Sequence, residues 1–168
     1  MEKSQAVPFG RVRLERGFWH DRQAVNTGAT LPAIRRQFER TGRFEAFRFG
    51  WKPGMPHPPH FFWDSDIAKW IEAVSYSLET RPDPRLEEAV DAVVELIARH
   101  QEPDGYFNIY FTVVEPGGRF TRRTHHELYC AGHLIEAAVA YAHATGKKRF
   151  LERMCRYADL IDRVFRVE

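Results

Sequence analysis

The chain has 168 residues, of which 43% are hydrophobic and 14% aromatic, enough for the core of one domain of ordinary size. Its 25 basic and 23 acidic residues give a formal net charge of only +2, so composition excludes the strongly basic surface of nucleic-acid-binding proteins and of proteins that bind anionic membranes. Two cysteines, Cys130 and Cys155, cannot form a disulfide framework. With no apolar run suited to a signal peptide or a membrane span, a soluble cytoplasmic protein with reduced thiols is expected.

The N-terminal third shows three patterns in succession. Residues 9–16 alternate apolar and charged side chains, and this period of two predicts a short β-strand. Residues 21–40 carry apolar side chains at helical spacing and predict a first helix, which Pro32 should kink or divide. Residues 44–63 are rich in Pro, Gly and aromatics and too many for a simple connection, which predicts a functional loop.

The next two predicted helices form one pair. Asp64 or Ser65 is expected to cap the first, and Asp83 followed by Pro84 is a strong start for the second. Both carry apolar residues at the i, i+3, i+4, i+7 spacing of a buried helix face. The inner faces are expected to contain Ile67, Trp70, Ile71, Val74 and Leu78 in the first helix, and Leu86, Val90, Val93, Val94 and Ile97 in the second.

A second helix pair follows an aromatic loop at residues 102–111. Thr124 and Glu127 have the spacing of a capping box, which predicts a helix start there, and Gly146 is expected to end that helix. The last helix should begin near Lys148. Its predicted buried residues are Phe150, Leu151, Met154, Ala158, Ile161 and Phe165.

The two helix pairs share a weak internal repeat. Ile71-Glu-Ala73 returns as Ile135-Glu-Ala137, and Arg85-Leu-Glu-Glu88 returns as Arg149-Phe-Leu-Glu152, both at an offset of 64 residues. A repeat of helix pairs predicts stacked α-hairpins, as in an α/α toroid or solenoid. About five helices would make only an open arc, so we expect the chain to be the N-terminal part of a longer protein.

The segment 124–133 concentrates more chemically active side chains than any other. His133 follows His126 by seven residues, and a helix drifts only about 20° per heptad, so both imidazoles should project from nearly the same side. Tyr129 and Cys130 fall on the same stripe. These groups can donate, accept, titrate or bind a metal, which predicts a site along one helix face.

Three segments together closely resemble glycoside hydrolase family 127, the β-L-arabinofuranosidase-like enzymes. They are Trp63-Asp-Ser-Asp-Ile-Ala-Lys-Trp-Ile-Glu-Ala73, Asp104-Gly-Tyr-Phe-Asn-Ile-Tyr-Phe111 and His126-Glu-Leu-Tyr-Cys-Ala-Gly-His-Leu-Ile-Glu-Ala137. The resemblance implies an all-α fold for residues 1–168, namely a partial (α/α)6 toroid of helical hairpins with a small N-terminal β element. It covers only the first portion of the family's catalytic domain, so the rest of the barrel and the β-sandwich domains are expected to be absent.

The resemblance also implies the chemistry. Family enzymes hold zinc with cysteine thiolates and a glutamate beside a cysteine nucleophile, and these residues belong to the later half of the barrel. A retaining hydrolysis of β-L-arabinofuranoside-type bonds is therefore expected of the longer enzyme, with no catalytic residue, zinc ligand or other cofactor in this chain, which alone should be inactive. The expected partner is a small saccharide or glycoside, and the longer protein could form a homo-oligomer.

Candidate substrate-binding residues follow from the same motifs. His126 stands where the family histidine contacts the furanose, and His133 lies on the same stripe. Asp64 and Asp66 could order the rim of the pocket or simply favour the helix dipole. Amphipathic rings suit sugar faces but could equally pack the loops. The aromatic candidates are Trp63, Tyr106, Phe107 and Tyr110.

Other interpretations stay open. Glu127 could be a capping residue or a catalytic group. A metal site made by His126, Cys130 and His133 would spread its ligands too far along one helix. The function could also be that of a helical-repeat module that binds a saccharide or peptide, or of another (α/α)6 sugar-active enzyme such as an epimerase or an unsaturated-sugar hydrolase.

Overall fold

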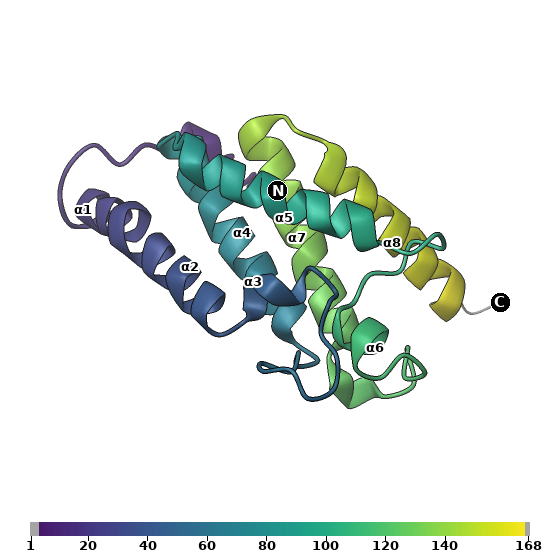
Figure 1. The fold of residues 1–168 in the computed structure, drawn as a ribbon. Helices are drawn as coiled ribbons and strands as arrows, with labels where there is room; N and C mark the ends of the chain where they lie inside the picture. The colour runs from purple at the N-terminus through teal and green to yellow at the C-terminus, as the bar shows by residue number, and fades with distance from the viewer. Residues whose placement is uncertain (1–3, 167–168) are drawn as a thin grey trace.

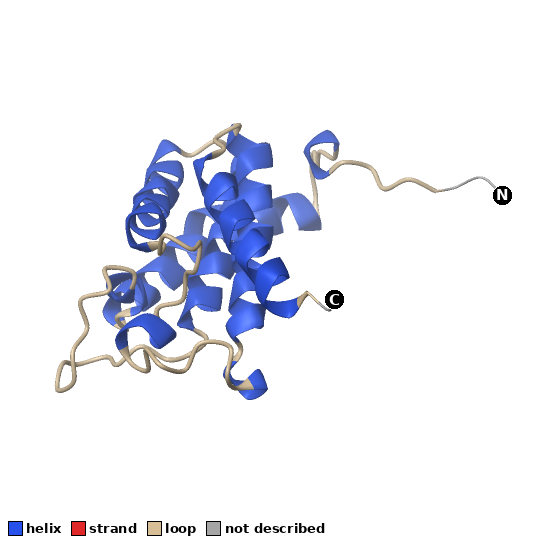
Figure 2. Cartoon of the chain, turned by 90° about the vertical axis from the view of Figure 1, so that its right-hand side faces the viewer, coloured by secondary structure: helices blue, strands red, loops and turns tan. Residues whose placement is uncertain are grey.

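Every regular element in the described part of the chain is helical. The computed structural model describes residues 4–166, and the five terminal residues that the predicted domain also includes lie outside this part. Figure 2 shows helices and loops but no strand among the described residues. The all-α class is confirmed, whereas the strand predicted at residues 9–16 is wrong. A short 3-10 turn, Phe9–Arg11, begins that segment, and residues 4–166 contain no second strand to supply the hydrogen bonds that a β-strand needs.

The first helix is divided at the predicted proline. Helix α1, Phe18–Val25, continues through a π-helical turn, Asn26–Thr30, into α2, Leu31–Arg40. Pro32 lacks an N–H group, so it cannot donate the backbone hydrogen bond that a regular helix makes to the preceding turn. The wider π-helical turn ends two residues before it. A single helical turn, α3 at Arg43–Ala46, then leads into the long loop that ends at α4.

Two α-helical hairpins make up the rest of the molecule. The first joins α4, Trp63–Thr80, to α5, Pro84–His100, and the second joins α7, Glu127–Thr145, to α8, Arg149–Phe165. The longest helix contact is between α4 and α7, and α8 packs on both α7 and α5. The two hairpins therefore lie side by side, with α4 and α7 starting at the same end of the molecule (Figure 1).

The aromatic loop between the hairpins is part of the core. It contains the helical turn α6, Tyr110–Val113, and a second short turn, Arg123–His125, precedes α7. The predicted inner faces of α4 and α5 are buried, as are Phe150, Met154 and Leu160 of α8, but Phe165 is 47% exposed. The loop adds four buried hydrophobic residues, Tyr106, Phe107, Ile109 and Phe111.

Two helix-end predictions are confirmed. The Asp83 carboxylate accepts hydrogen bonds from the amides of Arg85 and Leu86 at the start of α5. Gly146 follows α7 in the left-handed conformation, with φ of 76°, which glycine adopts without steric cost.

Two other helix-end predictions are wrong. Helix α4 begins after Phe62 with no side-chain cap, and both Asp64 and Ser65 are buried inside its first turn. The capping box of Thr124 and Glu127 does not form, because His126 occupies the cap position and the Glu127 side chain turns into the core. In both cases the carboxylate that the local pattern assigned to a cap accepts a hydrogen bond from a buried residue elsewhere in the fold. Ile109 donates to Asp64, and Tyr106 donates to Glu127.

Among residues 4–166, none of the helices is both long and apolar enough to cross a bilayer.

Candidate functional site

An open groove lies between the N-terminal ends of α4 and α7. Its volume is about 280 Å³. The repeat explains its position, since Trp63 and Glu127, the first residues of the two helices, are themselves 64 positions apart and begin at the same end of the molecule. The groove is lined by Phe62, Ser65, Asp66, Lys69, His126 and Tyr129.

His126 presents an exposed imidazole to this groove from a strained backbone position. Its φ of 56° lies in the left-handed region, which costs an L residue on the order of 1–2 kcal/mol. The ring stacks on Phe61 at 5.6 Å between centroids and meets Tyr129 edge-on at 5.5 Å. Neighbouring rings thus fix the imidazole while leaving it accessible, as a binding group requires.

Lys69 of α4 and Tyr129 of α7 join the two sides of the groove. The Lys69 ammonium donates a hydrogen bond of 2.6 Å to the Tyr129 hydroxyl and lies 4.8 Å from the centre of its ring. Sequence reasoning missed Lys69. Its spacing of three residues from Asp66 places both on one face of α4, and this signal could have found it.

Asp66 lies at the rim and is already paired. Its carboxylate accepts a hydrogen bond of 2.7 Å from Arg43 Nε, and both side chains are about one-quarter exposed. The Arg43 guanidinium also lies over the half-buried Trp63 ring, 4.9 Å from its centre. Arg43 therefore joins α3 to α4 beside the groove through its contacts with Asp66 and Trp63. The sequence did not indicate Arg43 as a site residue.

Asp64, which precedes the groove residues Ser65 and Asp66, is fully buried. One carboxylate oxygen accepts a hydrogen bond from the Ile109 amide at 3.2 Å, and the other is buried without a hydrogen-bond partner in the protein. Burial raises the pKa of this carboxyl to about 7, while the hydrogen bond to Ile109 opposes the rise. In the described structure Asp64 fastens the aromatic loop and does not face the groove.

Cys130 is an inert thiol. It is buried, and its Sγ lies 3.5 Å from the Phe61 carbonyl oxygen, to which it donates. Burial and the nearby Asp64 carboxyl raise the pKa of the thiol well above its ordinary value. A protonated, enclosed thiol is neither a nucleophile nor a metal ligand, so Cys130 has a structural role in this fold.

Glu127 anchors the loop before α7. Its two oxygens accept hydrogen bonds from the Tyr106 hydroxyl at 2.5 Å and from the Phe120 amide at 2.6 Å. Burial raises the pKa of the carboxyl, and these two donors oppose the rise. The Arg119 guanidinium stacks 3.4 Å from the centre of the Tyr106 ring. Both oxygens of Glu127 thus point away from the groove.

The aromatic candidates separate into core and surface groups. Tyr106 and Phe107 are buried, with Phe107 packed on Phe47 at 5.9 Å, so these rings build the core and do not reach the groove. Tyr110 is half-buried and lies edge-on to Phe61 at 6.0 Å. The rings that do line the groove are Phe62 and Tyr129.

The predicted stripe along α7 forms for three of its four members. His126, Tyr129 and His133 follow one another, with the Tyr129 and His133 rings edge-on at 4.5 Å, while Cys130 turns inward. His133 is half-buried and lies beyond the groove. Its Nδ1 is 3.2 Å from a Glu136 carboxylate oxygen.

The residues of this chain do not fit the cysteine-held zinc that the family resemblance implies. Its two thiols lie on different helices, Cys130 buried on α7 and Cys155 exposed on α8. Neither belongs to a group of three metal-ligating side chains within residues 4–166. No step of the chemistry can therefore be assigned to such a zinc ion from the donors described.

Known proteins resemble the chain over nearly its whole length. Residues 11–167 match the family described as β-L-arabinofuranosidase, GH127 catalytic domain. The non-reducing end β-L-arabinofuranosidase of Bifidobacterium longum subsp. longum is 43% identical over 109 residues, which are 62% of this chain and 17% of that protein.

Two solved structures share the fold. A GH127 β-L-arabinofuranosidase from Geobacillus stearothermophilus T6 superposes with a TM-score of 0.88 at 46% identity, and a second GH127 β-arabinofuranosidase superposes with a TM-score of 0.82 at 36% identity. Each comparison covers 94% of this chain but 26% of the other, so the chain spans about a quarter of these relatives. The match of the family over residues 11–167 confirms the resemblance: the chain belongs to the GH127 β-L-arabinofuranosidase catalytic-domain family.

Proposed function

We propose that this chain supplies one wall of the sugar-binding site of an enzyme that hydrolyses β-L-arabinofuranoside-type bonds. Family membership supports the reaction class, since the relatives reported above are arabinofuranosidases. Because the chain spans about a quarter of the solved relatives, its contribution is a part of the site. The groove between α4 and α7 is the part that we assign to the sugar.

The exposed His126 imidazole is the observation that carries this proposal. Its ring nitrogens can hydrogen-bond a sugar hydroxyl, and the stacked Phe61 ring limits its rotation. Phe62 and Tyr129 offer apolar ring surface to the less polar face of a furanose, and Lys69 can donate to a further oxygen. Orientation of the sugar is the role that these groups can perform.

Bond cleavage is assigned to groups other than those in the groove. Glycosidases commonly use two carboxyl groups that flank the scissile bond. Asp66, the acid that lines the groove, is paired with Arg43, and Asp64, two residues before it, is fully buried. We therefore propose binding residues and no catalytic residue within residues 4–166. A cytoplasmic location and oligomerisation of the longer protein stay predictions.

Replacement of His126 tests the proposal in a protein that carries the complete family domain. His126→Ala should lower kcat/KM for an aryl β-L-arabinofuranoside roughly tenfold to a thousandfold, as loss of an aligned hydrogen bond to the transition state would. The melting temperature should change little, because the imidazole is exposed. Steady-state kinetics and thermal unfolding on one preparation provide both readouts.

The matched control is His143→Ala, which removes an exposed histidine farther along α7. Its kcat/KM should equal that of the wild type. A His126→Ala variant with wild-type kcat/KM would remove His126 from the site. A protein that binds the arabinofuranoside but never cleaves it would favour the saccharide-binding module instead of the enzyme.

A further inference from the structure

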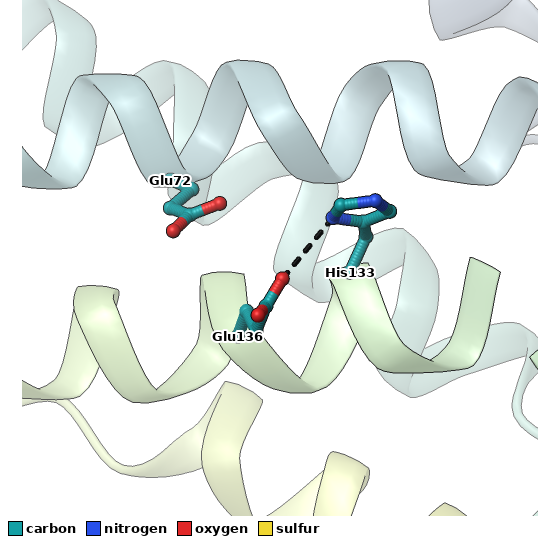
Figure 3. A group of neighbouring side chains, drawn as sticks. All are labelled: Glu72, His133 and Glu136. Atoms are coloured by element: carbon teal, nitrogen blue, oxygen red, sulfur yellow. Dashed lines mark ion pairs between the residues drawn. The ribbon is translucent and has the colours of Figure 1, made fainter. Parts of the chain in front are cut away.

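A group of three metal-ligating side chains lies between α4 and α7, beyond the groove. Glu72 projects from α4, and His133 and Glu136 project from α7 toward it (Figure 3). One ligand atom from each lies within 4.8 Å of the other two. Within residues 4–166, this is the one group of three or more histidine, cysteine or acidic side chains with that proximity.

The internal repeat explains why two carboxylates meet there. Glu72 and Glu136 occupy equivalent positions, 64 residues apart, and α4 and α7 pack along their length. Equivalent faces of the two helices therefore present equivalent acids to one another. His133 lies one turn before Glu136 and faces the same space. Its counterpart in the first repeat, Lys69, bonds to Tyr129.

The surroundings of the trio are rich in negative charge. Glu79 lies farther along α4 and lines the same surface hollow as Glu72, Tyr76 and Glu136. Tyr76 donates a hydrogen bond of 3.2 Å to one oxygen of Glu72. Lys69, one turn before Glu72 on α4, donates a hydrogen bond to Tyr129. A bound cation would offset the repulsion between the acids.

The imidazole of His133 has a nitrogen that the protein leaves without a hydrogen bond. Nδ1 is buried and lies 3.2 Å from a Glu136 oxygen, but the pair lacks hydrogen-bond geometry. Proximity alone qualifies it as an ion pair when His133 is protonated. A buried ring nitrogen that faces two carboxylates without a directed bond has the position of a metal ligand.

We propose that Glu72, His133 and Glu136 bind a divalent transition-metal ion of the Zn²⁺ class. One imidazole nitrogen and two carboxylate oxygens form a donor set that zinc accepts, at distances of about 2.0–2.2 Å, with water completing the shell. The three donors must draw together by small side-chain rotations, which the exposure of Glu136 permits. The bound ion would clamp α4 to α7. This site does not depend on the proposed sugar groove.

Metal titration of the untagged chain tests the site. Co²⁺ serves as the spectroscopic probe and Zn²⁺ as the calorimetric one. Both should bind with a stoichiometry of one, and the Co²⁺ spectrum should lack sulfur-to-metal charge-transfer bands. His133→Ala and the isosteric Glu136→Gln should each weaken binding at least about tenfold, since even the outer partners of metal ligands have effects of that size. Zn²⁺ should raise the melting temperature of the wild type but not of these variants.

Two variants serve as matched controls. His57→Ala removes an exposed histidine of the loop before α4, away from the trio, and Cys155→Ser removes the exposed thiol. Neither should change the Zn²⁺ affinity. Should His133→Ala fail to fold by circular dichroism, Glu136→Gln and Glu72→Gln, which preserve side-chain shape, decide the question. Three outcomes would overturn the proposal: Zn²⁺ binding that does not saturate, Zn²⁺ affinity lost in a control variant, and Zn²⁺ affinity unchanged by Glu136→Gln and Glu72→Gln. His133 and Glu136 would then form only an ion pair.

Discussion

Asp64 shows how one buried carboxyl links the groove to the core. It belongs to the first turn of α4, where an acid commonly favours the helix dipole at the surface. Here it is enclosed, and its hydrogen bond from Ile109 fixes the aromatic loop under the groove. The rise of its pKa to about 7 comes mainly from the loss of hydration on burial.

This buried carboxyl should make stability depend on pH. Its pKa is about 7 in the folded chain against an ordinary value of 3.8, so the folded state binds the proton more tightly than the unfolded state. Its contribution to the free energy of unfolding is therefore full below about pH 4 and is lost as pH rises to about 7. Asp64→Asn should remove this loss and stabilise the protein at pH 8 by a few kcal/mol, on the order of 1.4 kcal/mol per unit of pKa.

Urea unfolding at pH 5 and pH 8 measures the effect. The control is Asp159→Asn, which changes an exposed carboxyl of α8 and should leave both values unchanged relative to the wild type. Equal pH dependence in wild type and Asp64→Asn would show that Asp64 ionises freely in the folded chain.

At the scale of elements, the position of α7 depends on the loop that precedes it. Glu127 opens this helix and holds both Tyr106 and Phe120 through its two oxygens. The same contacts position His126, the adjacent residue, at the groove. A carboxylate in the core thus determines where an exposed imidazole lies.

Removal of this anchor should loosen the loop more than the helices. Glu127→Ala leaves the Tyr106 hydroxyl and the Phe120 amide without their partner, at a cost of about 1–3 kcal/mol for each buried group that stays unpaired. Thermal or urea unfolding should show the loss. Faster hydrogen exchange at the Phe120 amide should locate it. Glu152→Ala on the exposed side of α8 is the control, and equal stability of the two variants would contradict the anchoring role.

At the scale of the whole molecule, the proposed sugar groove has neither an accessible thiol nor a free carboxylate beside it among residues 4–166. The Cys130 thiol is enclosed and protonated, Asp64 is buried, and Asp66 is held by Arg43. Tyr76 on α4 and Tyr129 on α7 are both exposed, so the surface that these two helices form is accessible to solvent.

The isolated chain should therefore show no hydrolysis of an aryl β-L-arabinofuranoside. Release of the aryl group, followed by absorbance with and without added Zn²⁺, checks this expectation against a buffer blank. Turnover that disappears in Cys130→Ser would contradict the structural role of that thiol. Turnover that persists in Cys130→Ser would instead point to another group as nucleophile.

The sequence by itself determined the helical hairpins, their 64-residue repeat, the family and the stripe of His126, Tyr129 and His133. These features depend on helical periodicity, on local caps such as Asp83, and on motifs read along one segment. The helices, their caps and the stripe are fixed by residues a few positions apart, and the repeat and the family follow from comparing motifs along the chain, so no knowledge of distant contacts is required.

Only the tertiary structure decided which polar groups turn inward and which segments find partners. Local patterns assigned Asp64 and Glu127 to helix caps, but Ile109 and Tyr106, 45 and 21 residues away, take their carboxylates. Residues 9–16 alternate like a strand yet have no strand beside them among the described residues. The pairing of Glu72 with His133 across two helices is likewise invisible in either helix alone. A sequence pattern specifies which face of an element is apolar, whereas the packing of distant elements decides what each polar side chain meets.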